Sequence, residues 1–250
     1  MEAVDLRSVV VETISMCTQR CFHCKYGVIN VLPRVMPGDF VYKIVDDLAA
    51  VNYDKRLSFF CGNEPLLDPS LEDFFAYASR KLPRAVLDLT SNGDLATISV
   101  LEKLFNAGMQ KILFSLHSKT LEGRFEKYQE AFGSAQISFV DHTEAAAMQR
   151  FNNRGGLVKS KSVSQKLHPN SNCALPFKQM VVWSDCTVGL CCVDMNETIK
   201  IQVEAKHKQS IYNLFYDSKM LNKFRTMLQE QRRDLAPCCD CSYSGWDGFE

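Results

Sequence analysis

Short apolar runs alternate with amphipathic stretches along the first 140 residues of the chain. Runs typical of buried strands occupy 9–14, 57–61, 86–90, 111–116 and 137–140. From the second run onward their starts lie about 25–30 residues apart, which is the period of successive βα units in a parallel sheet. Five such units are too few to close an eight-stranded barrel. The pattern therefore predicts an α/β fold whose sheet forms a partial (β/α) barrel.

The stretches between these runs carry helix signals. Asp39 is expected to cap a helix in which apolar residues recur at helical spacing. Pro69 stands where the first turn of the next helix tolerates proline. Ser99 is expected to cap a third helix and Gly108 to end it.

Polar segments follow four of the predicted strands. A cysteine loop (residues 17–24, C-T-Q-R-C-F-H-C) follows the first strand, 62–65 the second, 91–93 the third and His117 the fourth. Sites in βα barrels gather at the carboxyl ends of the strands. We therefore expect these four segments to share one rim.

The pattern changes near residue 145, which predicts domains at 1–150 and 151–250. A polar turn at 152–156 and a loop precede an apolar hairpin at 180–190, and a predicted helix over 214–228 leads to C238-C-D-C241. Two cysteines near the hairpin and a C-x2-C pair after the helix make a four-ligand set. Four thiolates can hold zinc or a [4Fe–4S] cube without an open position.

Composition narrows the function classes. Lys and Arg total 29 and Asp and Glu total 29, so no basic excess indicates nucleic-acid binding. No apolar run approaches the ~20 residues of a membrane span, and the N-terminus lacks the order of a signal peptide. Eleven cysteines without an export signal favour a reducing cytoplasm, where thiols bind metal rather than form disulfides.

The cysteine loop itself indicates an unusual metal centre. Cys17, Cys21 and Cys24 offer three thiolates in a short segment, and the next cysteine is Cys61. Three thiolates can hold three irons of a [4Fe–4S] cube and leave the fourth iron open to bind a small molecule. Half of a zinc site, or a group of buried thiols, is the alternative.

Together with G62-N-E-P65, the spacing C-x3-C-x2-C resembles the radical S-adenosylmethionine (SAM) superfamily. In that family SAM binds the open iron, and its reductive cleavage gives a 5′-deoxyadenosyl radical that abstracts hydrogen from the substrate. The resemblance implies a partial barrel, and it implies that Cys17, Cys21 and Cys24 hold the cluster.

The same resemblance assigns SAM contacts. Gly62, Glu64 and Pro65 match the motif that receives the SAM amino group, with Asn63 in place of its second glycine. His23 stands where the family usually has an aromatic residue that touches adenine.

Three further rim residues are candidate SAM contacts. Ser91 and Asn92 are expected to hydrogen-bond the SAM ribose or carboxylate, and the alternative is a strand-ending turn closed by Asn-Gly. His117 joins the cofactor candidates, with a rim histidine satisfied by its neighbours as the alternative.

The resemblance extends to members with a short C-terminal "twitch" (SPASM-like) domain that holds an auxiliary [4Fe–4S] cluster. It is carried by E64-P-L-L67, S91-N-G-D94, G108-M-Q-K111, N153-R-G-G156 and the spacing from Cys173 to Cys191. It implies a second cysteine set of auxiliary ligands, namely Cys173, Cys191, Cys238 and Cys241. Cys192 and Cys239, each adjacent to a proposed ligand, are close alternates, and Cys186 is an extra thiol.

These members include dehydrogenases that oxidise a secondary alcohol of an aminocyclitol in natural-product (aminoglycoside-like) biosynthesis. The chain is accordingly expected to oxidise a secondary alcohol of an aminocyclitol or sugar to a ketone, with an external electron donor such as flavodoxin or ferredoxin. Arg154 is the candidate for positioning the hydroxyl or the SAM carboxylate, and Asp194 for orienting the substrate. Their alternatives are a solvated turn arginine and a surface carboxylate.

Two other functions are weighed against this hypothesis. A radical SAM enzyme that modifies a ribosomal peptide usually carries a leader-binding domain, for which the residues before the first predicted strand leave no room. A zinc-stabilised interaction module would use the C-terminal cysteines, but it leaves the cysteine loop, residues 62–65 and the βα period unexplained.

Overall fold

The sheet is built outward from β1 (Ser8–Val11), four consecutive buried residues. In the computed structural model, which describes residues 3–143, 151–203 and 210–245, β1 is followed by four strands that pair in parallel, each on the one before. They are β2 (Arg56–Ser58), β3 (Val86–Ser91), β4 (Lys111–Leu116) and β5 (Ile137–Asp141). All five strands lie where the apolar runs predict them, although β1 and β2 are shorter than their runs.

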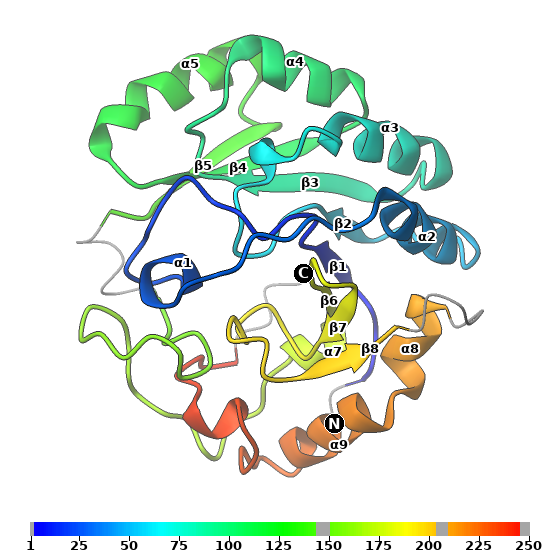
Figure 1. Cartoon of the computed structure of the whole chain (residues 1–250), viewed down its shortest axis with the longest axis vertical. Helices are drawn as coiled ribbons and strands as arrows, with labels where there is room; N and C mark the ends of the chain where they lie inside the picture. Colours follow the sequence, from blue (N-terminus) through cyan, green and yellow to red (C-terminus); the bar gives the residue numbers. More distant parts are fainter. Residues whose placement is uncertain (1–2, 144–150, 204–209, 246–250) are drawn as a thin grey trace.

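Four helices lie along one face of these parallel strands (Figure 1). They are α2 (Gly38–Ala49), α3 (Leu71–Lys81), α4 (Ile98–Asn106) and α5 (Glu122–Phe132). Their apolar stripes bury residues such as Ile44, Phe75 and Leu101 completely, in one core with the outward-facing strand residues. This layer leaves the other face of the strands for the site.

The first two predicted helix starts are wrong by one or two residues. The N-cap of α2 is Pro37, so Asp39 lies in the first turn, where its charge still favours the helix N-terminus. Pro69 precedes α3, whose N-cap is Ser70.

The third helix differs in the same way at its start. The N-cap of α4 is Thr97, whose hydroxyl accepts a hydrogen bond from the Val100 amide at 3.2 Å, so Ser99 lies inside the helix. Gly108 follows the helix at a φ of +107°, which confirms the predicted end.

The second half of the chain extends the same sheet. β6 (Gln179–Val182) pairs in parallel with β1, and β7 (Thr187–Gly189) and β8 (Lys200–Gln202) follow antiparallel, which confirms the predicted hairpin. The order is β5-β4-β3-β2-β1-β6-β7-β8, so the sheet stays open, as expected for a partial barrel. Strands from both sides of residue 150 thus share one sheet.

The predicted helix over 214–228 is two helices. α8 (Ile211–Asp217) ends at Ser218, whose extended backbone breaks the helix and whose hydroxyl caps α9 (Lys219–Gln229). The remaining helical turns are short: α1 (Lys25–Val28), α7 (Leu175–Lys178), η1 (Pro65–Leu67), η2 (Lys119–Leu121) and η3 (Cys238–Asp240). None of the helices in the described ranges is long and apolar enough to cross a bilayer.

Candidate functional site

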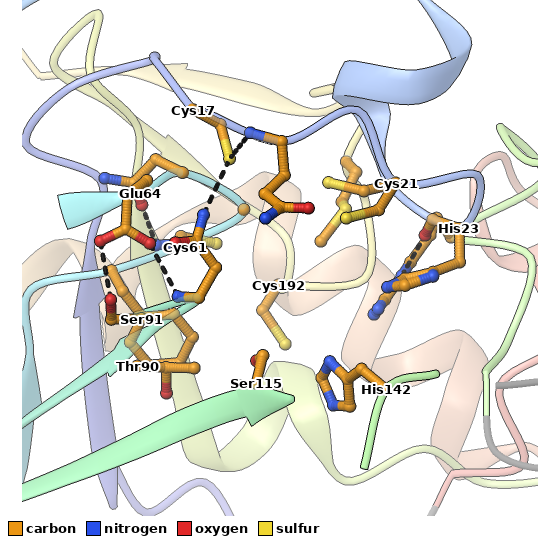
Figure 2. A pocket seen from close by; sticks show the side chains of 18 of the residues that line it. Cys17, Cys21, His23, Cys61, Glu64, Thr90, Ser91, Ser115, His142 and Cys192 are labelled. Carbon is orange, nitrogen blue, oxygen red and sulfur yellow. Dashed lines mark hydrogen bonds between the residues drawn. The ribbon is translucent and has the colours of Figure 1, made fainter. Parts of the chain in front are cut away.

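The four rim segments line one cavity of about 220 Å³, here called the rim cavity. The three thiols of the cysteine loop face it together with Glu64, Ser91 and His117. Figure 2 shows these segments around it, with Cys61, Ser115, His142 and Cys192 on the remaining sides. The prediction that four separate segments share one rim is therefore confirmed, because the carboxyl ends of parallel strands lie at one edge of the sheet.

Glu64 joins the loop after β2 to the end of β3. Its carboxylate accepts hydrogen bonds from the Leu66 amide (3.0 Å), the Ser91 hydroxyl (2.8 Å) and the Asn92 amide (2.7 Å). The side chain is completely buried, and burial raises the pKa of Glu64 although these hydrogen bonds oppose the rise. Three of about four acceptor positions are used, so one position remains for a donor in the cavity.

Ser91 and Asn92 are engaged within the protein. The Ser91 hydroxyl also accepts from the Gly93 amide at 2.9 Å. The side-chain amide of Asn92 donates to the Thr18 hydroxyl (2.9 Å), and its nitrogen lies 3.8 Å from the Cys17 sulfur. Both side chains thus hold the cysteine loop and Glu64 in place.

The cysteine loop presents thiols that are poor nucleophiles on their own. Burial raises the pKa of Cys17, and it raises that of Cys21 to about 12. Such thiols ionise only when a cation binds them, as iron does. The Gln19 amide points at the Cys17 sulfur (3.4 Å), which favours a thiolate there. The donor set therefore fits an iron–sulfur cluster.

Aromatic rings line one side of the cavity. The His23 ring stacks on Phe151, with centroids 3.9 Å apart, and is nearly parallel to His117 at 6.1 Å. Burial lowers the pKa of His23 to about 3, so its ring is neutral and acts as an apolar surface. His142 meets both histidines edge-on, and His117 Nδ1 lies 3.6 Å from the Cys21 sulfur.

Arg154 brings the second half of the chain to the rim cavity. It lines the cavity, its Nε donates to the His23 carbonyl at 3.2 Å, and its guanidinium lies 5.2 Å from the Phe151 ring centroid. Its backbone φ is +52°, a conformation that a non-glycine residue adopts at a cost. A solvated turn arginine does not describe this placement.

Asp194 lies away from the rim cavity and lines the small cavity described below, and its role in orienting substrate stays a prediction. Its two oxygens accept from the Thr198 and Ile199 amides, both at 3.0 Å, and it does not line the rim cavity. Burial raises the pKa of Asp194. The carboxylate shapes the turn after Cys191, which a sequence pattern cannot distinguish from a substrate contact.

The second cysteine set gathers around a small separate cavity. Cys173, Cys191, Cys238 and Cys241 all line it, and Cys239, Cys192 and Cys186 do not. Arg233 closes it by donating to the carbonyls of Ser171, Asn172 and Tyr243. Burial raises the pKa of Cys173 to about 11 and of Cys238 to about 12, so these thiols also need a cationic partner to ionise. The donor set fits a fully ligated cluster.

The spacing of the thiols does not suit one zinc ion. Four thiolates around zinc, each about 2.3 Å from the metal, would lie about 3.8 Å apart. Within the described ranges, the one group of three or more potential ligands with atoms within 4.8 Å of one another is Cys21, His23 and His117. Neither the cysteine loop nor the second cysteine set is that compact.

Sequence reasoning missed the inner wall of the rim cavity. Thr90, Ser115, Gln179 and Cys192 line it, with Val10, Phe60, Cys61 and Met195. Inward alternation along the predicted strands could have found Thr90 and Ser115. Gln179 and Cys192 reach the cavity only because β6 pairs with β1, and no local pattern shows that pairing.

Comparisons with known proteins agree with this architecture. The S-adenosyl-L-methionine-dependent 2-deoxy-scyllo-inosamine dehydrogenase of Niallia circulans is 26% identical over 232 residues, covering 92% of this chain and 89% of its own. The crystal structure of BtrN in complex with AdoMet and 2-DOIA has a TM-score of 0.85 at 23% identity, covering 99% of this chain and 97% of its own. Streptococcus suis SuiB bound to precursor peptide SuiA has a TM-score of 0.55 at 10% identity, covering 96% of this chain and 70% of its own. These two likenesses concern the fold.

The family follows from a further match. Residues 11–148, more than half of the 250 residues, match the model of the radical SAM superfamily. This segment contains the cysteine loop, Glu64 and the strand ends that build the rim cavity. The chain therefore belongs to the radical SAM superfamily.

Proposed function

We propose that this protein is a radical SAM dehydrogenase that oxidises a secondary alcohol of an aminocyclitol or sugar to a ketone. The observation that carries the proposal is the second cysteine set, one buried and three half-buried cysteines around their own cavity beside the rim cavity. An alcohol oxidation removes two electrons, and a second cluster gives the second electron a destination. The relative from Niallia circulans, matched over 89% of its length, is named as a dehydrogenase of 2-deoxy-scyllo-inosamine.

In this proposal Cys17, Cys21 and Cys24 hold the first [4Fe–4S] cluster, and Cys173, Cys191, Cys238 and Cys241 hold the auxiliary one. When bound, the first cluster and SAM supply a radical that removes hydrogen from carbon, and the auxiliary cluster supplies a one-electron acceptor. Residues 151–250 then form the twitch domain. An external carrier such as flavodoxin or ferredoxin provides the reducing electron.

The protein's own side chains prepare the substrate. Arg154, fixed by the His23 carbonyl, directs its guanidinium charge into the cavity and orients the hydroxyl or the SAM carboxylate. A guanidinium group has hydrogen-bond donors and no acceptor, so Arg154 positions the oxygen rather than removing its proton. The remaining acceptor position of Glu64 suits the SAM ammonium, because a hydrogen bond between charged groups is the stronger kind.

A cytoplasmic location is part of this proposal. All eleven cysteines are unpaired, which supports a reducing compartment such as the cytoplasm.

The test is anaerobic turnover. Reconstituted protein is incubated with SAM, a one-electron reductant and a panel of aminocyclitols and sugars, and mass spectrometry follows 5′-deoxyadenosine and a product two daltons lighter. We expect both products in parallel, and neither from a variant in which the three loop cysteines are alanine. Production of 5′-deoxyadenosine with an epimerised or cross-linked product would instead reject the dehydrogenase.

A further inference from the structure

Few charged side chains line the rim cavity. Among the described residues of its lining, Glu64 is the only carboxylate and Arg154 the only lysine or arginine. Glu64 is completely buried and already accepts three hydrogen bonds from the protein. The lining therefore offers no free carboxylate to a bound substrate.

Nearby acids do not change this balance. Asp88, on β3, is paired with Arg56 and Ser58 and does not line the cavity. Asp194 is held by two backbone amides around its turn. Neither can reach a substrate in the rim cavity without breaking these contacts.

The inner wall is polar but uncharged. Gln179, at the start of β6, is 6% exposed, and its Oε1 has no hydrogen-bond partner in the protein. Thr90 and Ser115 add hydroxyls from β3 and β4. A buried amide oxygen without a partner is costly unless a ligand donates a hydrogen bond to it. The wall is thus complementary to hydroxyl groups.

An ammonium group would be poorly accommodated here. A primary amine on a cyclitol is protonated at neutral pH. The remaining acceptor position of Glu64 is assigned to the SAM ammonium, so a second ammonium would enter the cavity without a side-chain carboxylate as its partner and would carry a large desolvation penalty. Arg154 adds like-charge repulsion. Uncharged hydroxyl groups pay a much smaller desolvation penalty, and they gain hydrogen bonds from the inner wall.

We infer that the rim cavity takes an uncharged polyol, a cyclitol or sugar without an amino group, and that Gln179 hydrogen-bonds one of its hydroxyls. The inference rests on the proposed function and narrows its substrate class. It separates this chain from a relative that is named for an amino-substituted substrate.

The first test compares matched ligands. scyllo-Inositol and scyllo-inosamine differ by one hydroxyl-to-amine exchange, and their binding to the SAM-loaded protein is measured by anaerobic calorimetry. We expect the neutral compound to bind about tenfold tighter or more, a factor that corresponds to about 1.4 kcal/mol. Equal or tighter binding of scyllo-inosamine, or of a sugar acid over its parent sugar, would overturn the inference.

The second test introduces a negative charge into the inner wall. Gln179→Glu places a carboxylate at an unchanged length and should reverse the preference toward scyllo-inosamine. Gln179→Met has a similar size but no amide. It should weaken the binding of scyllo-inositol, and the binding of scyllo-inosamine should remain weak. Circular dichroism and iron content establish that both variants fold. A folded Gln179→Glu protein that keeps the original preference would remove Gln179 from the substrate site and so contradict the inference.

Turnover separates the two proposals. If scyllo-inositol binds more tightly but neither compound is oxidised while SAM is cleaved, the dehydrogenase proposal fails and the charge inference is supported. If scyllo-inosamine is oxidised and preferred, the dehydrogenase proposal is supported and the inference is overturned.

Discussion

Lys25 forms a buried salt bridge with Glu12, the residue after β1, and the two side chains are 1% and 0% exposed. The other Glu12 oxygen accepts from the Ser184 hydroxyl at 2.8 Å, and Glu197 lies 3.4 Å from the Lys25 ammonium. Lys25 directly follows the last thiol of the cysteine loop, whereas Ser184 and Glu197 belong to the second half of the chain. Together these contacts fasten the cysteine loop to the turn between β6 and β7 and to the segment before β8.

Removing one partner of this pair should be severe. Lys25→Met leaves the Glu12 carboxylate buried without its cation, and we expect a loss of about 3–5 kcal/mol in the free energy of unfolding. The double variant Lys25→Met with Glu12→Leu removes both charges and should recover much of that loss. Urea unfolding of the reconstituted proteins measures both. A single variant within about 0.5 kcal/mol of the parent would show that the pair contributes little.

The fold was largely predictable because its strands are rich in apolar residues, and β1 is buried at every position. Such strands read as short apolar runs, and their regular spacing gives the βα order without any tertiary information. Helix starts were less certain because Ser99 and Thr97 are chemically equivalent caps two residues apart. Only the path of the chain decides that Thr97 has the extended backbone of a cap.

The site was predictable only where it follows from strand order. The rim segments converge because parallel strands end at one edge. The position of Gln179 in the wall and the contact of Glu12 with Ser184 depend on how the second half docks onto β1. That docking is a long-range pairing, and no spacing of residues in the sequence encodes it.

The turn after β3 depends on a glycine. Gly93 has a φ of +76°, and a Cβ there would lie 2.6 Å from Phe125, which is fully buried. Gly93→Ala should lower the free energy of unfolding by about 1–3 kcal/mol because the added methyl group overpacks the core. It should also disturb Ser91 and Asn92 beside Glu64. Gly123→Ala is the matched control, because nothing lies within 4 Å of its Cβ and it is helical.

The control variant Gly123→Ala should raise the free energy of unfolding by up to about 1 kcal/mol, since alanine favours the helix more than glycine does. Thermal unfolding and SAM affinity are measured for both. SAM affinity should fall for Gly93→Ala only. Equal effects of the two substitutions would mean that the turn after β3 tolerates a side chain.

A pH-dependent contribution to stability is expected from Glu197. Burial alone would raise the pKa of Glu197, but the Lys200 hydrogen bond at 2.6 Å and the nearby Lys25 charge lower it below its usual 4.5. A carboxyl whose pKa is lowered by folding stabilises the protein above pH 4.5, and this stabilisation is lost as the pH falls through the lowered value.

Lys200 also pairs with Asp185 and lowers the pKa of that carboxyl too. Lys200→Met should therefore lower the free energy of unfolding by about 0.5–1.5 kcal/mol at pH 7 through both partners, the smaller figure allowing for the partial exposure of Lys200. The difference from the parent should shrink as the pH falls below 4.5. Chemical unfolding midpoints between pH 3 and pH 8 give both curves. A constant difference across that range would assign the effect of Lys200 to packing.

Two neighbouring cysteines allow a matched test of the second cysteine set. Cys241 lines the small cavity with Cys238, whereas Cys239 points its thiol at Asp240, 3.5 Å away, and does not line the cavity. Two cubes correspond to about 8 irons per chain. Cys241→Ser should lower this to about 4, and Cys239→Ser should leave it unchanged. An iron loss in Cys239→Ser would move the ligand by one residue.

The same pair of variants tests where the second electron goes. If the auxiliary cluster accepts it, Cys241→Ser should form far less ketone per 5′-deoxyadenosine than the parent, because the cysteine loop is separate and still supports SAM cleavage. Metal binding often contributes folding energy, so limited proteolysis and circular dichroism must show that the variant retains its fold. Cys239→Ser should keep the parental ratio of the two products. Full ketone yield from folded Cys241→Ser protein that lacks the auxiliary iron would leave the second cluster a structural role only, since the electron would then reach its acceptor without it.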